Sequence, residues 1–182
     1  MASTLQFDQW QNAAGVTRST VLQTQYTNST TRVSTTLSGS FNEPSSAYRV
    51  NITPYYSNSL IIVKYYVPVN IASASNILQS WRAFRITNGT TYANLSSAGT
   101  TNGSRNVFAG GVLRPGNGFD TNDHNMVYWQ VLDIPGSTAT HTYGFQHYPE
   151  GGHTTYFGYS GSNNGTWGFD SNILIIAQEI AQ

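Results

Sequence analysis

Apolar and polar residues alternate along most of the chain with the two-residue period of a β-strand. The alternation is strong or detectable at residues 17–26, 30–37, 48–53, 79–87, 90–94, 124–134, 138–148 and 153–159. The run at 30–37 is rich in Thr and only weakly apolar, which is typical of an exposed or edge strand. Together with two further apolar runs, the pattern predicts about ten strands, little helix and an all-β sandwich or barrel.

Two segments are almost continuously apolar. Residues 60–69 contain one lysine among β-branched and aromatic residues, and Pro68 is tolerated near a strand end. Residues 172–180 read Asn-Ile-Leu-Ile-Ile-Ala-Gln-Glu-Ile. Such runs predict central strands that are buried on both faces. Both are far too short to span a bilayer.

Turn residues separate these runs. Asn88-Gly89 is a strong hairpin signal, and Pro135-Gly136-Ser137 predicts a turn between two well-alternating strands. Residues 96–123 are mostly Gly, Asn, Ser and Thr, and a loop of this length usually forms a functional loop or an interface. Residues 161–169 form a second glycine-rich loop.

The first sixteen residues differ from the rest. Phe7 and Trp10 lie in a polar segment that ends in Ala-Ala-Gly, which predicts a short helix between Ser3 and Gly15. We interpret residues 1–16 as an arm or docking segment, because two large aromatic residues on a polar terminus need a surface to bury them. The alternative is that the arm folds back on its own domain, which comprises residues 17–182.

Composition narrows the function classes. Charged residues make up 9% of the chain, eight basic residues balance eight acidic ones, and there is no cysteine. A scattered, neutral charge argues against nucleic-acid binding. The start lacks the basic and apolar regions of a signal peptide, so neither Sec export nor membrane insertion is expected. Asn, Ser, Thr and Tyr favour contacts with other protein chains or with sugars.

The order of several motifs resembles a known family. They are Val21-Leu22-Gln23, Ile52-Thr53-Pro54, residues 57–63, an Arg-containing strand before a Gly turn, Leu132-Asp133-Ile134-Pro135 before a Thr-rich strand with Tyr143, and the terminal Ile175-to-Ile180 pattern. This order resembles short tail-fibre-like virion proteins of tailed bacteriophages, whose domain is similar to the trimeric jelly roll of the complement C1q and tumour necrosis factor group. The chain differs from common relatives by Tyr55-Tyr56 in place of Ser or Thr, and by Gln178 in place of a Met-like residue.

The resemblance implies an antiparallel jelly-roll sandwich that assembles as a homotrimer. It also implies a structural protein of the virion, made in the host cytoplasm, that acts as a fibre or tip module in assembly and host attachment. Its partners would be other tail or capsid proteins and a host surface glycan. No shaft, collagen-like repeat or long coiled coil is present in the sequence. A capsid decoration protein, a carbohydrate-binding module and a polysaccharide depolymerase remain alternatives.

Enzymatic chemistry is not expected. Among the eight acidic residues only Asp120 and Asp123 are sequence neighbours. The carboxylate pair of a glycosidase can come from distant residues, so this count leaves hydrolysis open. However, the chain has no Gly-x-Ser-x-Gly elbow, no His-Glu-x-x-His, no P-loop and no Gly-x-Gly-x-x-Gly. We therefore predict no catalytic residues and no cofactor.

No metal site is predicted either. Residues 120–124 begin like a calcium loop but lack its later Gly and Glu, so a turn is the better interpretation. His141 and His147 share a strand face but lie ~20 Å apart along an extended strand. One chain cannot chelate a metal with both. A metal held on a three-fold axis by one histidine from each chain is the alternative to plain packing.

Aromatic residues near the 161–169 loop are the candidate contact site. Rings can stack on sugar faces while Asn amides bind hydroxyl groups. The residues that we assign to a receptor or glycan contact are Tyr156, Tyr159, Asn163, Asn164 and Trp167. The alternative is that these rings, with Phe157 and Phe169, belong to the core or to a subunit interface.

Overall fold

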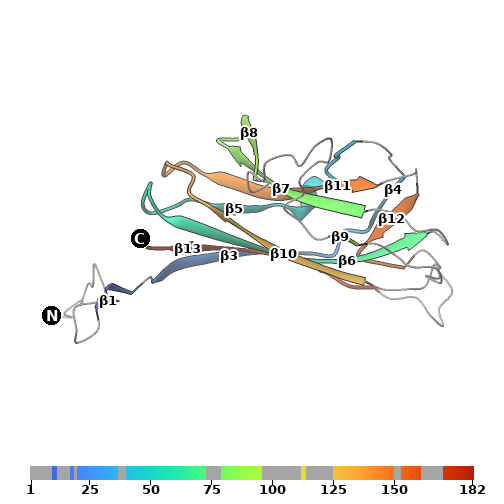
Figure 1. Ribbon diagram of the computed structural model, residues 1–182, viewed down its shortest axis with the longest axis horizontal. Helices are drawn as coiled ribbons and strands as arrows, with labels where there is room; N and C mark the ends of the chain where they lie inside the picture. The colour runs from blue at the N-terminus through green and yellow to red at the C-terminus, as the bar shows by residue number, and fades with distance from the viewer. Residues whose placement is uncertain are drawn as a thin grey trace.

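The protein is a sandwich of two antiparallel β-sheets in a computed structural model (Figure 1). The structure describes residues 10–11, 17–18, 20–36, 40–72, 79–95, 112–113, 125–149, 153–160 and 170–182. Within these residues the regular elements are strands and one short 3-10 helix, η1 (Ser46–Tyr48). The all-β prediction is therefore confirmed.

The larger sheet has six strands and forms the lower layer in Figure 1. Its strands are β3 (Val21–Ser29), β4 (Val33–Thr35), β6 (Leu60–Ala72), β10 (Asn125–Asp133), β12 (Thr154–Phe157) and β13 (Ile173–Ile180). The order across the sheet is β3-β13-β6-β12-β4, and β10 lies along the opposite edge of β6. β6 is the central strand, as its long apolar run indicates.

The smaller sheet has five strands and forms the upper layer. Its strands are β5 (Val50–Ile52), β7 (Gln79–Thr87), β8 (Thr91–Asn94), β9 (Val112–Leu113) and β11 (His141–Pro149). The order is β5-β11-β7-β8, and β9 pairs with the start of β7. The hairpin prediction at Asn88-Gly89 is confirmed, because both residues have positive φ, 50° and 71°, between β7 and β8.

The pairing of strands follows the nested scheme of a jelly roll. With β4, β9 and β12 set aside, eight strands remain in the sandwich. The first pairs with the last (β3 with β13), the second with the seventh (β5 with β11), the third with the sixth (β6 with β10) and the fourth with the fifth (β7 with β8). The ten strands of three or more residues that the structure describes match the number that the alternation predicts.

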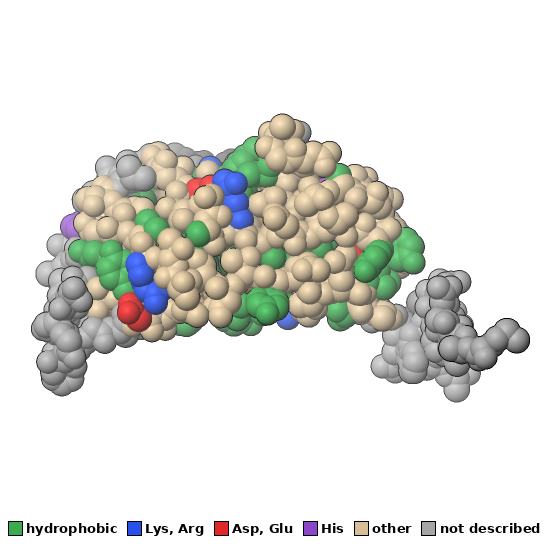
Figure 2. Space-filling model, turned by 180° about the vertical axis from the view of Figure 1, so that it is seen from behind, with side chains coloured by type: hydrophobic (Ala, Val, Ile, Leu, Met, Phe, Trp, Pro, Cys, Tyr) green, Lys and Arg blue, Asp and Glu red, His purple; other side chains and the backbone are tan. Residues whose placement is uncertain are grey.

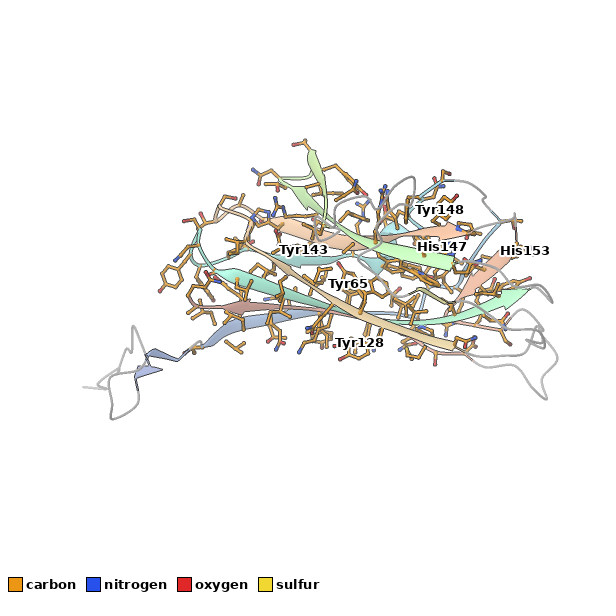
Figure 3. The ribbon with its side chains drawn as sticks, viewed as in Figure 1. Tyr65, Tyr128, Tyr143, His147, Tyr148 and His153 are labelled. Carbon is orange, nitrogen blue, oxygen red and sulfur yellow. The ribbon has the colours of Figure 1, made fainter. Side chains whose placement is uncertain are left out.

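The core lies between the layers and is built from inward-facing aromatic and β-branched side chains. Tyr65 stacks on Trp129 with ring centroids 4.6 Å apart, and Phe145 meets Trp129 edge-on at 5.7 Å. The phenol of Tyr65, which Figure 3 shows between the two sheets, donates to the Gly144 carbonyl at 3.1 Å. Burial of the ring is stabilising only because this hydroxyl has a partner.

The prediction that both central strands are buried on both faces is wrong for much of their length. In β13 and in the first half of β6, buried residues alternate with half-buried ones. Only residues 67–71 of β6 are buried without interruption. The outward side chains of these strands are therefore apolar without being covered by a second layer.

The predicted helix in the N-terminal arm is also wrong where the structure describes it. Trp10–Gln11 form the strand β1, which pairs with β2 (Thr17–Arg18) in a separate two-stranded sheet. β1 lies beyond the end of the sandwich at which the C-terminus lies (Figure 1). The segment around Trp10 is polar and short. An isolated helix of this length is only marginally stable, so the backbone pairs within the arm instead.

Candidate functional site

The outward side of the six-stranded sheet carries four adjacent strands whose side chains line up in rungs. Asn28, Leu174, Tyr66 and Tyr128 form one rung, and Tyr26, Ile176, Lys64 and Gln130 form the next. Thr24, Gln178, Ile62 and Leu132 form the third, and Val21, Ile180 and Leu60 the fourth. Met126 continues this side beyond the first rung. We refer to these residues together as the outer face.

The outer face is apolar although it is exposed. Nine large hydrophobic residues are exposed in the described part of the chain, and five of them belong to the outer face: Val21, Tyr26, Met126, Tyr128 and Leu132. A sixth, Ile134, follows the end of β10 and is 54% exposed. Figure 3 shows Tyr128 outside the lower layer, and in Figure 2 hydrophobic side chains recur along the lower margin of the molecule. Exposed apolar area on this scale is typical of an interaction surface.

The most exposed apolar residues form two rims, one along each edge of the four strands. Tyr26 on β3 is 69% exposed, whereas Leu132 on the far strand β10 is 61% exposed. Tyr128 on β10 also packs on Tyr66, with ring centroids 4.9 Å apart. Between the rims the residues of β13 and β6 are half-buried. The outer face therefore offers two separate apolar edges.

Lys64 is the single charged residue of the outer face. It is also the only lysine in the chain. Its ammonium Nζ donates to Oε1 of Gln178 on β13 at 2.9 Å, and Gln130 on β10 lies directly opposite Lys64 in the register. A small polar group is thus placed at the centre of an apolar surface.

The outward side of the five-stranded sheet is different in kind. Arg49 binds Glu43 through two hydrogen bonds of 2.7 and 2.6 Å, and Arg82 donates to Gln146 at 2.6 Å. Two rings on this side, Phe84 and Phe41, lie against other side chains, although Tyr92 itself is 46% exposed. Tyr92 stacks on Phe84 at 5.0 Å, and the Arg82 guanidinium lies 4.0 Å from the Phe41 ring centroid.

Two of the candidate contact residues, Tyr156 and Tyr159, lie at one end of the sandwich. Tyr156 on β12 and Tyr159 meet edge-on with ring centroids 5.2 Å apart, and both are half-buried. The structure therefore brings these two predicted residues together. Asn163, Asn164 and Trp167 lie outside the described residues. A receptor or glycan contact at this end stays a prediction.

The docking arm is described only in part. Phe7 lies outside the described residues, and for Trp10 the structure describes only the backbone, in β1. The proposed docking role of these two rings therefore stays a prediction.

The two histidines of β11 face the interior. His141 and His147 are 0% and 2% exposed, and Figure 3 shows His147 between the sheets. Burial lowers the pKa of His147 to about 3, and its Nε2 contacts Oε1 of Gln79. Burial also lowers the pKa of His141, whose ring contacts Thr87 and Ser137. Because both rings are enclosed by their own domain, a shared metal on a three-fold axis is excluded for them.

A buried acid organises the end of the sandwich near the C-terminus. Glu179 on β13 is fully buried, and its Oε1 accepts hydrogen bonds from Tyr55 N at 2.8 Å and Ser59 Oγ at 2.6 Å. Its Oε2 accepts from Gln23 at 2.6 Å. A buried carboxylate is tolerable only with such partners, so Glu179 holds the 53–59 loop in one conformation. The exposed rings of Tyr55 and Tyr56 are carried by this loop.

A second acid, Asp133, is paired between the sheets. Its Oδ2 accepts from Arg85 at 2.6 Å and from the Tyr143 hydroxyl at 2.8 Å. Burial raises the pKa of Tyr143, and the neighbouring Asp133 adds to this effect. The group ties β7, β10 and β11 together. It has a structural role, because neither Asp133 nor Arg85 keeps more than a fifth of its side chain exposed.

Sequence reasoning did not identify the outer face. The one available indication was that residues 60–69 and 172–180 are apolar at both odd and even positions. A strand buried on one side should be polar on the other, so the excess of apolar residues pointed to a second covered surface. For Glu179 the available indication was its position as the one acidic residue within the apolar run 172–180.

The described part of the chain lacks two features that would point to other functions. It contains no cluster of three or more His, Cys, Asp or Glu residues that is suited to a metal ion. Nor does it contain a helix that is long and apolar enough to cross a membrane. The outer face is the candidate functional site with the most support, because five of the nine exposed large hydrophobic residues of the described chain lie on it.

No protein-family model matches the chain, and no curated protein sequence matches it. The tail-fibre resemblance of the sequence motifs therefore stays a prediction.

Proposed function

We propose that this chain is a structural protein of a tailed-bacteriophage virion that assembles as a homotrimer through its outer face. It serves as a fibre or tip module for assembly and host attachment. The observation that carries the proposal is the exposed apolar outer face on β3, β13, β6 and β10. Exposed apolar faces of this kind are typical of surfaces that bind another molecule.

The size of the outer face supports an interface. Four strands spaced ~4.8 Å apart, with rungs that extend over about seven residues at ~3.3 Å each, outline about 400 Å². The largest apolar patch of a typical monomer covers ~300–600 Å² and is often functional, so the outer face has the size of an interaction site. Tyr and Met are also among the residue types that are enriched in protein interfaces. The outer face combines both features.

The two rims support a ring. A two-fold dimer buries the same patch on both subunits, whereas a cyclic assembly joins one patch to a different patch on the next subunit. The β3 rim (Val21 and Tyr26) and the β10 rim (Met126, Tyr128 and Leu132) provide two such patches on one sheet. The number three comes from the family resemblance.

The second copy is favoured over an unrelated charged partner. Apart from Lys64 the outer face carries only apolar and neutral groups, so it offers no charge pattern that an acidic or basic protein would recognise. Neutral, amide-bearing and apolar surfaces are complementary to themselves. The outer face therefore suits another copy of this chain.

The virion role rests on the order of the sequence motifs and agrees with the nested jelly-roll pairing. In a fibre or tip module, the end that carries Tyr156 on β12 and its neighbour Tyr159 is the candidate receptor contact, because β1 and the C-terminus lie at the opposite end (Figure 1). A capsid decoration protein is the alternative within the same class. Either role requires a self-assembling, neutral sandwich.

Light scattering after gel filtration tests the assembly. We expect the full chain to have the mass of a trimer at micromolar concentration, and Leu132→Arg, on the β10 rim, to be a monomer. The matched control is Thr142→Arg, which places the same charge on the outward side of β11. The control should remain trimeric. A monomeric wild-type chain would contradict the proposal.

Copy number in purified particles tests the virion role. Quantitative mass spectrometry against the major capsid protein separates the locations, because a tail carries a few symmetric rings whereas an icosahedral head repeats its decorations over every capsomer. Tens of copies would support the fibre or tip, and hundreds would support a capsid decoration. Absence of the chain from the particle would overturn both.

A further inference from the structure

We propose that Lys64, held by Gln178, sets the number of copies and their register in the assembly. This inference rests on the proposed function, because it concerns the same outer face. Lys64 lies on β6, the central strand of the six-stranded sheet, and has apolar or amide neighbours in every direction along and across the rungs. It is the only charge that the assembly would have to bury there.

Apolar contacts alone select a register poorly. The outer face carries apolar side chains at most alternate positions of its four strands, with neutral polar groups between them, so sliding two copies by one rung exchanges many apolar contacts for other apolar contacts. The hydrophobic effect is non-directional and roughly proportional to area, so such alternatives are similar in free energy. Something directional has to distinguish them.

The ammonium of Lys64 provides that direction. A buried cation that meets only aliphatic groups costs several kcal/mol. Gln178 satisfies only one of its three donors in the single chain. A register that brings oxygen atoms of the neighbouring copy to the remaining donors is therefore strongly preferred over one that does not. A single polar residue fixes register and copy number in the same way in helical assemblies, at a cost in stability.

On the outer face as the structure describes it, the available partners of Lys64 are neutral. Each side-chain carboxylate among the described residues is bonded within its own chain: Glu43 to Arg49, Asp133 to Arg85, Asp170 to Arg32, and Glu179 to Gln23 and Ser59. The oxygens on the outer face belong to Gln130, Gln178, Thr24, Asn28, Tyr26, Tyr66 and Tyr128. Lys64 is thus expected to bind amide and hydroxyl oxygens of the neighbouring copy, which are short and directional contacts.

Native mass spectrometry of four full-length proteins tests this role. We expect the wild type to give one mass. Lys64→Met keeps the length of the side chain but removes the charge, and we expect it to associate at least as strongly but with several masses. Lys64→Arg keeps a cation with several donors, and we expect a single mass again. The matched control is Arg82→Met, which removes a cation bonded to an amide on the other sheet and should leave one mass.

Gln178→Leu separates the support of Lys64 from its charge. This variant keeps the ammonium but removes its acceptor, so the dissociation constant of the assembly should rise about tenfold or more. An unchanged constant would show that Gln178 does not position Lys64.

Acylation of Lys64 tests whether its amine is buried in the assembly. Lys64 carries the only side-chain amine, so its modification is read at a single peptide. We expect the acylation rate to fall about tenfold when nine copies in ten are assembled, because only free copies react. An acylation rate that does not change with protein concentration would overturn the proposal.

Two failures are distinguishable. A wild-type chain that is monomeric at every concentration overturns the proposed function and this inference together. A wild type of one mass beside a Lys64→Met variant of the same single mass overturns only the role of Lys64. Circular dichroism confirms that each variant is folded before its mass is interpreted.

Discussion

The outward sides of the two sheets differ in how far their apolar side chains are exposed. On the five-stranded sheet, side chains of the same chain cover the rings: Tyr92 stacks on Phe84, and Arg82 lies over Phe41. On the six-stranded sheet, Tyr26 and Leu132 are more than half exposed. The core needs only the inner side of each sheet, so the outer sides are free to differ.

The difference shows on which sheet the outward side chains find their partners within the same chain. Ion pairs and cation–π contacts on the five-stranded sheet satisfy polar groups locally, and such a surface gains little from a partner. The outer face of the six-stranded sheet instead leaves apolar area in water, and its burial is worth roughly 25 cal/mol per Å². The exposed apolar area of the two sheets is therefore concentrated on one side of the molecule.

Adjacent residues of β10 give the largest expected effect. Trp129 points inward and stacks on Tyr65, so Trp129→Ala should lower the free energy of unfolding by about 3–5 kcal/mol. Tyr128→Ala, one residue away on the outer face, should lower the unfolding free energy of the single chain by less than about 1 kcal/mol but weaken assembly by about 2 kcal/mol. Denaturant titration and light scattering measure the two effects. Equal losses of chain stability would contradict the assignment of inner and outer sides.

Glu179 and Gln178 give the same comparison for polar groups on β13. Glu179→Leu leaves Tyr55 N and the Ser59 hydroxyl without their acceptor, so it should cost about 3 kcal/mol of unfolding free energy. Glu179→Gln keeps one acceptor oxygen and should cost about 1 kcal/mol. Gln178→Leu, which points outward, should change chain stability by less than about 0.5 kcal/mol. Urea unfolding at low protein concentration measures all three, and an unaffected Glu179→Leu variant would exclude the anchoring role.

The interior of the five-stranded sheet should respond to pH. Burial lowers the pKa of His147 to about 3, from the usual 6.5 of a histidine. The unfolded chain therefore binds a proton that the folded chain rejects, so stability is fully present above about pH 6.5 and is lost as the pH falls toward about 3. Between about pH 7 and about pH 5 the wild type should lose about 2 kcal/mol more than His147→Phe. Parallel losses in urea titrations of the two proteins would show that His147 is not the titrating group.

The smallest effects are expected at two partly exposed ion pairs. The Arg49–Glu43 pair keeps 33% and 20% of its side chains exposed, so Glu43→Ala should cost about 1 kcal/mol or less. The Arg32–Asp170 pair has an Asp side chain that is 74% exposed, and Arg32→Ala should cost less than about 0.5 kcal/mol. Neither variant should change the mass of the assembly in light scattering. A dissociated Glu43→Ala protein would show that the five-stranded sheet takes part in association.

Much of the fold could be predicted from the sequence because strand formation depends on local alternation and turn residues. The strand at Gln79–Thr87 and the Asn88-Gly89 hairpin match the prediction closely. The candidate site was harder to predict from the sequence. Tyr156 and Tyr159 were predicted by their chemistry, but the contact between their rings depends on how the chain leaves β12. The arm at Trp10 was misread because pairing with Thr17–Arg18 overrides a weak helical preference.

The sequence by itself determined the fold class, the period of the strands and the neutral, aromatic character of the surface. Only the tertiary structure decided which apolar residues stay uncovered. Alternation shows which residues share one side of a strand, but not whether another layer packs against that side. Ile62 and Ile176 look like core residues in the sequence, yet they lie on the outer face beside Lys64. A nested jelly roll places every strand against a second sheet on one side only, so the other side of even its most apolar strands is left uncovered within the chain.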